Sequence, residues 1–166
     1  MELIINEEKT KFMQVTSKPI RTSELIVGEQ KFEVVQHFKY LGTIVTNDIS
    51  LDIEIRYRIS LENNCYHRLK HQLRSQFLNL RTKLNLYKTL LKPVLTYGSE
   101  CWSLNRRNEE QLQVFERRML RKIFGPICDN GKWRIRYNSE LYSIYNSNSK
   151  IKTCIDFSIN IFSENF

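Results

Sequence analysis

Residues 51–74 read LDIEIRYRISLENNCYHRLKHQLR, and this stretch decides the predicted fold. Its apolar side chains are three, four or seven residues apart, which places them on one face of a helix. They are Ile55, Ile59, Tyr66, Leu69 and Leu73. Glu62 falls on the same face, so we expect either a buried Glu62 paired with an arginine or a rotation of the helix there. Asp48, Ser50 or Asp52 is expected to cap the helix. The sequence therefore predicts a long amphipathic helix from about residue 51.

The preceding stretch, residues 11–46, is rich in β-branched and aromatic side chains, which favour strands. Gly28 predicts a tight turn between strands at 24–27 and 31–35. Residues 38–45 alternate aromatic and aliphatic side chains, with Gly42 where the backbone can approach another molecule closely. A small β region is therefore expected before the helix.

Helical periodicity continues after residue 80. One helix is predicted over residues 81–97, and Pro93 inside it should kink or split it. Another is predicted from Asn105 or Asn108 to the Gly125-Pro126 pair. A last amphipathic segment is predicted from four aromatic residues and one leucine: Trp133, Tyr137, Leu141, Tyr142 and Tyr145. Three aromatic residues are expected in the core rather than stacked on bases: Tyr97, Trp102 and Trp133.

The predicted fold class is α+β, with a small antiparallel β-sheet or hairpin region followed by a mainly helical bundle. Three parts are expected: a β region over residues 1–46, a helical region over 47–145 and a divergent tail over 146–166.

Positive charge is concentrated in one part of the chain. The chain has 26 Lys and Arg against 18 Asp and Glu, a formal net charge of +8. Residues 56–92 contain one acid, Glu62, and nine basic residues: Arg56, Arg58, Arg68, Lys70, Arg74, Arg81, Lys83, Lys88 and Lys92. Nine positive charges and one negative charge give this segment a formal charge of +8, which equals the net charge of the whole chain. A solvated helix surface usually mixes both signs, so this segment indicates a polyanionic partner, either nucleic acid or an anionic membrane surface.

The remaining composition favours an intracellular chain, cytoplasmic or nuclear. Four cysteines are widely spaced, and no pair has the CxxC spacing: Cys65, Cys101, Cys128 and Cys154. The first residues do not match a signal peptide, and no run of about 18 apolar residues predicts a membrane span.

Metal-dependent phosphoryl chemistry requires carboxylates close together. The four aspartates are dispersed, and capping or turn roles explain the first three: Asp48, Asp52, Asp129 and Asp156. His67 and His71 have a spacing that can bind zinc, but no third ligand is evident. No Gly-rich phosphate loop or nucleophile elbow occurs. The sequence thus predicts no catalytic centre, metal site or cofactor in this chain, which is not expected to be an enzyme as it stands.

Six strings resemble, in order, the reverse transcriptases of non-long-terminal-repeat retrotransposons, of the jockey-like kind. They lie at residues 6–13 (NEEKTKFM), 38–43 (FKYLGT), 54–63, 86–102 (LYKTLLKPVLTYGSECW), 115–126 (FERRMLRKIFGP) and 133–142 (WRIRYNSELY). The resemblance implies the end of a polymerase palm, a primer grip and a thumb. It also implies that magnesium would be bound by palm aspartates that this sequence lacks.

By this resemblance, Lys9 matches a lysine near the phosphates of the incoming nucleotide that assists departure of pyrophosphate. The implied partner is an RNA or DNA template–primer duplex, held by the primer grip and the basic thumb helices. The predicted nucleic-acid-binding residues are Lys39, Tyr40, Leu41, Gly42, Arg56, Arg58, Arg68, Lys70, Arg74, Lys83 and Lys88.

Two alternatives to nucleic-acid binding remain open from the sequence. One is a non-enzymatic helical module that binds a protein through an aromatic face. The other is a pseudogene product without a selected function. Residues 146–166 depart from the family pattern, and Glu62 stands where the family usually has a small residue.

Overall fold

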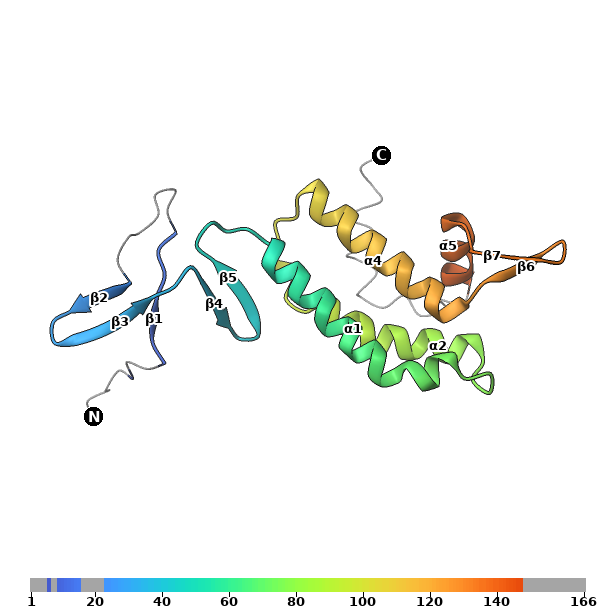
Figure 1. Cartoon of the computed structure of the whole chain (residues 1–166), viewed down its shortest axis with the longest axis horizontal. Helices are drawn as coiled ribbons and strands as arrows, with labels where there is room; N and C mark the ends of the chain where they lie inside the picture. The colour runs from blue at the N-terminus through green and yellow to red at the C-terminus, as the bar shows by residue number, and fades with distance from the viewer. Residues whose placement is uncertain (1–5, 7–8, 16–22, 148–166) are drawn as a thin grey trace. The chain divides into compact units, whose positions relative to one another are not determined.

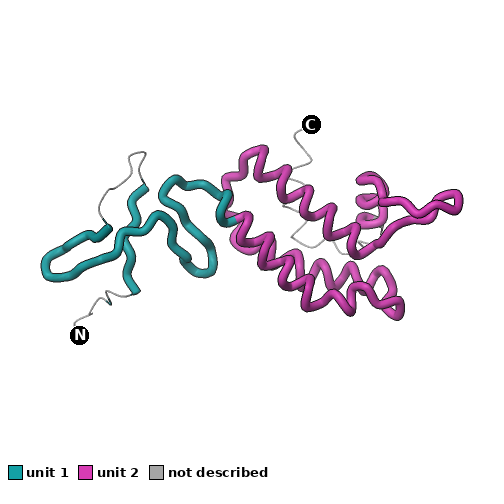
Figure 2. Tube along the Cα trace, viewed as in Figure 1, with its two compact units in different colours: residues 1–54 teal, residues 55–166 magenta. Residues whose placement is uncertain are grey.

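Strands come first and most of the helices follow, so the α+β prediction is confirmed (Figure 1). The computed structural model describes residue 6, residues 9–15 and residues 23–147. The chain divides into two units, residues 1–54 and residues 55–166 (Figure 2). The predicted tail over 146–166 lies almost wholly outside the described residues.

The first unit contains a three-stranded sheet in the order β1-β3-β2. β2 (Glu24–Val27) and β3 (Gln30–Val34) form the predicted antiparallel pair, with Leu25 opposite Phe32. The turn between them contains Gly28, whose φ of 64° suits a residue without a Cβ. β1 (Lys11–Phe12) pairs with β3 in parallel, and Lys11 forms an ion pair with Glu33.

A separate two-stranded hairpin follows in the same unit. β4 (His37–Tyr40) and β5 (Thr43–Thr46) are antiparallel, and Leu41-Gly42 forms the two-residue loop. The Oε2 atom of Glu54, which is fully buried, accepts a hydrogen bond of 2.7 Å from the backbone N–H of Ile44. This bond ties the hairpin to the first turn of α1 (Asp52–Arg74).

The approach to α1 uses the capping residues that the sequence suggested. The Asp48 carboxylate accepts from the Ser50 N–H at 3.0 Å, and the Ser50 hydroxyl accepts from the Asp52 N–H at 3.3 Å. Hydrogen bonds from the Thr46 side chain and the Ser50 backbone lower the pKa of Asp48, so this carboxylate stays charged. Turn formation therefore accounts for Asp48.

The second unit contains most of α1 and a series of shorter elements (Figure 1). In chain order they are α2 (Leu80–Leu86), the π-helical turn η1 (Tyr87–Leu91), α3 (Lys92–Thr96), the 3₁₀ turn η2 (Ser99–Cys101), α4 (Arg106–Phe124), β6 (Ile127–Asp129), β7 (Lys132–Arg134) and α5 (Asn138–Ser147). The Asn105 side chain caps α4 by accepting from the Asn108 N–H at 2.9 Å, and Gly125 follows the last residue of the helix.

Every helix of this unit contributes to one apolar core. Its buried members include Tyr66 and Leu73 of α1, and the rest come from the segments that follow: Leu84, Tyr87, Leu91, Leu95, Phe115, Met119, Leu120, Ile123, Leu141 and Tyr145. The apolar positions predicted from the periodicity of the sequence include four of these residues: Tyr66, Leu73, Leu141 and Tyr145. Burial of this surface is the main source of stability for the unit.

Pro93 splits the predicted helix over 81–97, as expected. Proline donates no backbone hydrogen bond and crowds the preceding turn. Directly before it, the N–H of Lys92 donates to the carbonyl of Tyr87, five residues back, and the helix widens into the π-helical turn. Both Tyr87 and Lys92 are buried there.

The prediction of core positions for Trp133 and Tyr97 is wrong. Trp133 lies on β7 with 73% of its surface exposed, and Tyr97 is 53% exposed. Residues 127–134 form a β-hairpin, so the first two residues of the predicted amphipathic segment, Trp133 and Arg134, lie on a strand. The Asn130-Gly131 pair, with φ of 49° and 78°, was the available signal for this hairpin. Trp102 is partly buried.

The Glu54–Ile44 hydrogen bond gives a first prediction. Glu54→Ala should remove the charged acceptor and lower the free energy of unfolding of the hairpin by about 1.5–3 kcal/mol. Amide hydrogen exchange should then show faster exchange at Ile44. Amides in the middle of α4 serve as the internal control, and unchanged protection at Ile44 would contradict the role given to Glu54.

Candidate nucleic-acid interface

The exposed side of α1 carries a row of basic side chains. With about 100° of rotation per residue, Arg56, Lys70 and Arg74 lie within about 40° of one another around the helix. All three are exposed, and the buried stripe that contains Ile55 and Leu73 lies on another side. Arg56 and Arg74 are 18 residues apart, a rise of roughly 27 Å at 1.5 Å per residue. We call Arg56, Lys70 and Arg74 the α1 basic row.

Other basic residues of the segment lie beside this row or on the next helix. Arg68 is exposed on α1, and the exposed His67 and His71 are its neighbours. On α2, Arg81 is exposed and Lys83 is partly exposed. These side chains add to the positive potential of the surface without being aligned with the row.

Among the nine basic residues, Arg58, Lys88 and Lys92 contact aromatic rings or a carboxylate. Arg58 is buried, with its guanidinium carbon 4.6 Å from the centre of the Tyr97 ring. The Lys88 ammonium lies 4.4 Å from the centre of the Tyr145 ring. Lys92 is buried, 3.8 Å from the carboxylate of Glu116 and 3.5 Å from the Tyr145 hydroxyl. Arg58 and Lys88 were predicted to contact nucleic acid; the structure places both against aromatic rings.

Glu62, the one acid among residues 56–92, is fully buried in α1. Glu62 is thus buried, as one of the two expectations had it, but neither of its carboxylate oxygens has a hydrogen-bond partner among the described residues, so the pairing with an arginine is wrong. Burial and, next in size, the nearby Glu116 carboxylate raise its pKa to about 8, although Lys92 and Lys122 act in the opposite direction. Glu62 is therefore largely protonated at pH 7.

The burial of Glu62 changes the charge of the surface. An ionised acid on the exposed side of α1 would offset part of the positive potential. Glu62 lies inside the protein and is largely neutral at pH 7. It therefore does not offset the positive charge of the basic side chains in residues 56–92, and this segment contains no other acid. Seven of the nine are exposed or partly exposed, since Arg58 and Lys92 are buried.

The tip of the β4–β5 hairpin is a second candidate surface, in the other unit. Lys39 and Tyr40 are exposed on β4, Leu41 is 75% exposed, and Gly42 is partly exposed. Leu41 has φ of 46° and Gly42 has φ of 87°. Both central residues of a type I′ turn need positive φ, which Asn and Gly adopt easily and Leu does not. An exposed, strained Leu at a turn is a feature that folding alone does not require.

Lys9 lies in a turn near the start of the chain and is exposed. Its backbone N–H donates to the Asn6 side chain at 3.1 Å. Among the described residues, no three His, Cys, Asp or Glu side chains lie close enough to hold a metal ion. Asp129 is bound to Arg134 at 3.1 Å. Asp156 lies outside the described residues.

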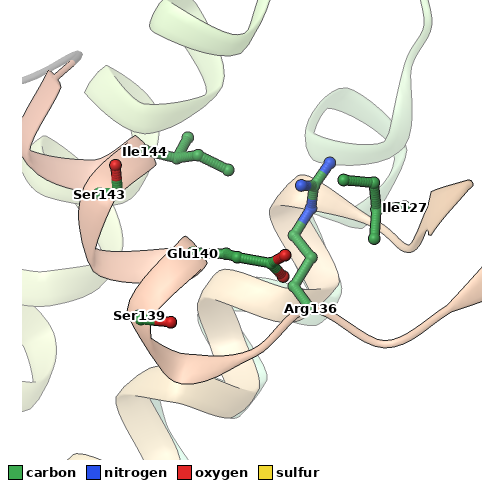
Figure 3. A pocket seen from close by; sticks show the side chains of 6 residues that line it. All are labelled: Ile127, Arg136, Ser139, Glu140, Ser143 and Ile144. Carbon is green, nitrogen blue, oxygen red and sulfur yellow. The ribbon is translucent and has the colours of Figure 1, made fainter. Parts of the chain in front are cut away.

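A shallow, open hollow of about 380 Å³ lies beside α5 (Figure 3). Its lining residues are Ile127, Arg136, Ser139, Glu140, Ser143 and Ile144. Arg136 extends between Glu140 and Ile127, so charges of both signs meet there (Figure 3). None of the residues predicted to bind nucleic acid lines this hollow. No helix in the described part of the chain is both long and apolar enough to span a membrane.

The fold and the basic surfaces define an α+β chain with a positively charged helical unit. The chain is similar to an uncharacterized transposon-derived protein of Caenorhabditis elegans, with 25% identity over 127 residues. These residues are 74% of this chain and 44% of the relative, so the chain spans less than half of that protein's length. The similarity indicates a transposon origin. No model of a known protein family matches the chain, and no solved structure matches it.

The buried Glu62 makes stability depend on pH. The folded state holds the Glu62 proton more tightly than the unfolded chain does, because the folded pKa is about 8 and the ordinary value is 4.5. The stabilising contribution of this proton is complete below pH 4.5 and is lost as the pH rises to about 8. Glu62→Gln keeps a neutral side chain at every pH. It should match the native chain at pH 5 and exceed its free energy of unfolding by roughly 3–5 kcal/mol at pH 9.

Urea denaturation at pH 5, 7 and 9 measures this difference. Glu110→Gln is the matched control, because Glu110 is exposed on α4 and pairs only with Arg106, four residues away, in the ion pairs described. Equal pH dependence in the native chain and in Glu62→Gln would show that Glu62 is not the titrating group.

Proposed function

We propose that this chain is part of a retrotransposon reverse transcriptase, corresponding to the end of the palm, the primer grip and the thumb. In this proposal it binds template–primer duplex through the sugar-phosphate backbone. It does not carry out nucleotidyl transfer by itself, because the sequence offers no paired carboxylates for magnesium. The proposed duplex is RNA–DNA or DNA–DNA, bound without sequence preference.

The observation that carries the proposal is the α1 basic row, combined with the burial of Glu62. Lys70 and Arg74 are about 6 Å apart along the helix and Arg56 lies about 21 Å from Lys70, so the row can contact phosphates at two separate places on a duplex. Contacts with phosphates carry no sequence information, so binding through this row should depend on charge rather than on sequence. The sequence resemblance and the similarity to a transposon-derived protein support the same class.

The β4–β5 hairpin supports the primer-grip part of the proposal. Its tip presents an exposed ring at Tyr40, an exposed Leu41 and a glycine backbone at Gly42. A small, rigid turn of this kind can approach a sugar and its phosphate closely. The strained Leu41 backbone is maintained although Asn would fit the turn better, which favours a role for the side chain in binding.

A non-enzymatic protein-interaction module is the second candidate. It is favoured by apolar side chains exposed in the first unit, among them Ile26 and Val27 of β2. Such a module would bind through apolar contacts, so its association should change little with salt. The helix surface over residues 56–92 favours nucleic acid instead, because it does not mix charges of both signs.

The duplex proposal predicts a steep dependence on salt. Affinity for an RNA–DNA duplex, measured by fluorescence anisotropy between 50 and 300 mM KCl, should fall linearly on a log–log plot. The triple variant Arg56→Gln, Lys70→Gln, Arg74→Gln should bind more weakly and reduce the slope by about 2–3.

The matched control is Lys31→Gln, Arg106→Gln, Arg107→Gln, which removes the same charge from exposed positions outside the α1 basic row. Affinity that is independent of salt, or equal losses in the two triple variants, would rule out the α1 basic row as the duplex contact.

The strained turn gives a separate prediction. Leu41→Asn should relieve the left-handed strain and raise the free energy of unfolding by about 1 kcal/mol, while weakening duplex binding. Ile49→Asn is the matched control: Ile49 has φ of 57° and is 72% exposed in the same unit, outside the hairpin tip. It should gain stability and keep its duplex affinity. If Leu41→Asn also binds normally, the tip is not a grip on the primer.

A further inference from the structure

The segment from Lys132 to Tyr137 has its apolar side chains on the outside. Trp133, Ile135 and Tyr137 are 73%, 72% and 63% exposed, while Arg134 and Arg136, which alternate with them, are partly buried. A segment that lies against a protein normally turns apolar side chains inward and charged ones outward. The reversed pattern puts two aromatic rings and an aliphatic side chain in water, which folding of the chain does not explain.

The two arginines hold this reversed arrangement in place. The Arg134 guanidinium donates to Glu140 at 2.7 and 3.0 Å and to Asp129 at 3.1 Å. These bonds lower the pKa of Glu140 to about 2, so the pair stays charged. The Nε atom of Arg136 donates to the carbonyl of Gly125 at 3.1 Å. Both arginines thus contact the rest of the unit, and the three residues that alternate with them face solvent.

The hairpin that carries Trp133 is tightly constrained. β6 and β7 are joined by Asn130-Gly131, both with positive φ, as in a type I′ turn. Cys128 is opposite Trp133 in the register. The Arg134 guanidinium also lies 4.5 Å from the centre of the Tyr137 ring. The Tyr137 ring, held in this way, loses little conformational freedom when a ligand stacks on it.

The segment of the chain that carries these rings is positively charged. Residues 117–147 contain seven basic residues and two acids, Asp129 and Glu140, a difference of +5. Both acids are bound to Arg134. The basic residues are Arg117, Arg118, Arg121, Lys122, Lys132, Arg134 and Arg136. Aromatic rings in such surroundings match a ligand that has flat apolar groups along an anionic backbone.

We propose that Trp133, Ile135 and Tyr137 form a stacking surface for the unpaired bases of single-stranded nucleic acid, with nearby cations such as Lys132 contacting its phosphates. This surface is separate from the α1 basic row, and its ligand is a single strand instead of a duplex. The bases of a duplex are already stacked on one another, so they are not free to stack on Trp133.

Charge decides against the other occupants of this surface. A second copy of the chain would also carry a formal charge of +8 and would bring a second basic segment against the first. A neutral, apolar protein partner would leave the +5 of residues 117–147 without a counterpart. In single-stranded nucleic acid, the unpaired bases can stack on the exposed aromatic rings, and the phosphates supply the negative charge.

The experiment uses the full chain and the fluorescence of tryptophan. The sequence contains two tryptophans, so Trp102→Phe leaves Trp133 as the single reporter. The Nε1–H of Trp102 is buried without a partner among the described residues, and phenylalanine keeps an aromatic ring there. Addition of a 12-nucleotide oligo(dT) should quench the emission of Trp133, with an affinity that falls as KCl is raised.

Substitution tests the same contact by anisotropy with labelled oligo(dT). Trp133→Ala should weaken binding on the order of tenfold, and Trp133→Phe should retain most of it. Phe77→Ala is the matched control, since Phe77 is 99% exposed in the α1–α2 loop and its loss should change nothing. Affinity for a blunt duplex should be unaffected by Trp133→Ala, so failure here and failure of the duplex proposal are distinguishable.

Three outcomes would overturn the proposal. The first is unquenched Trp133 emission together with normal oligo(dT) affinity in Trp133→Ala. The second is an equal loss for single strand and duplex, which would indicate phosphate contacts only. The third is self-association, seen by sedimentation, that Trp133→Ala abolishes while oligo(dT) affinity is unchanged; this would assign the surface to a second copy of the chain.

Discussion

The helical unit depends on a small set of polar side chains inside its core. Lys92 of α3 lies beside Glu116 of α4 and the Tyr145 hydroxyl of α5, and Glu62 of α1 is buried near the same groups. Four helices therefore each contribute one member. A buried charge without a counter-charge destabilises a protein by several kcal/mol, so the packing of these helices is most stable when Lys92 lies beside Glu116 and Glu62 is protonated.

This internal arrangement also determines the outer surface. Glu62 is the one acid of residues 56–92, and it is buried in the core. It therefore does not reduce the positive potential at the surface of this segment. The second basic segment, residues 117–147, follows a similar principle, because Arg134 binds both of its acids. In each case internal pairing or burial removes negative charge from the surface and leaves cations available to a polyanion.

Strain and exposure appear at positions where folding alone would favour other residues. Leu41 has a left-handed backbone that Asn or Gly would adopt more easily, and Trp133 is exposed on a hairpin fixed by arginine contacts. Such departures from local preference are expected where a surface is kept for binding. These two positions are thus the most informative sites for substitution.

The sequence by itself determined the α+β order, the antiparallel pair of β2 and β3, the turn at Asp48 and the split at Pro93, because each depends on periodicity or on one local residue type. It also located the basic segment. Only the tertiary structure decided which cations face solvent, since Arg58 and Lys92 are buried by contacts with residues far along the chain. It likewise moved Trp133 out of the core and left Glu62 without an arginine, because both depend on which helix packs beside which, a property that local spacing does not contain.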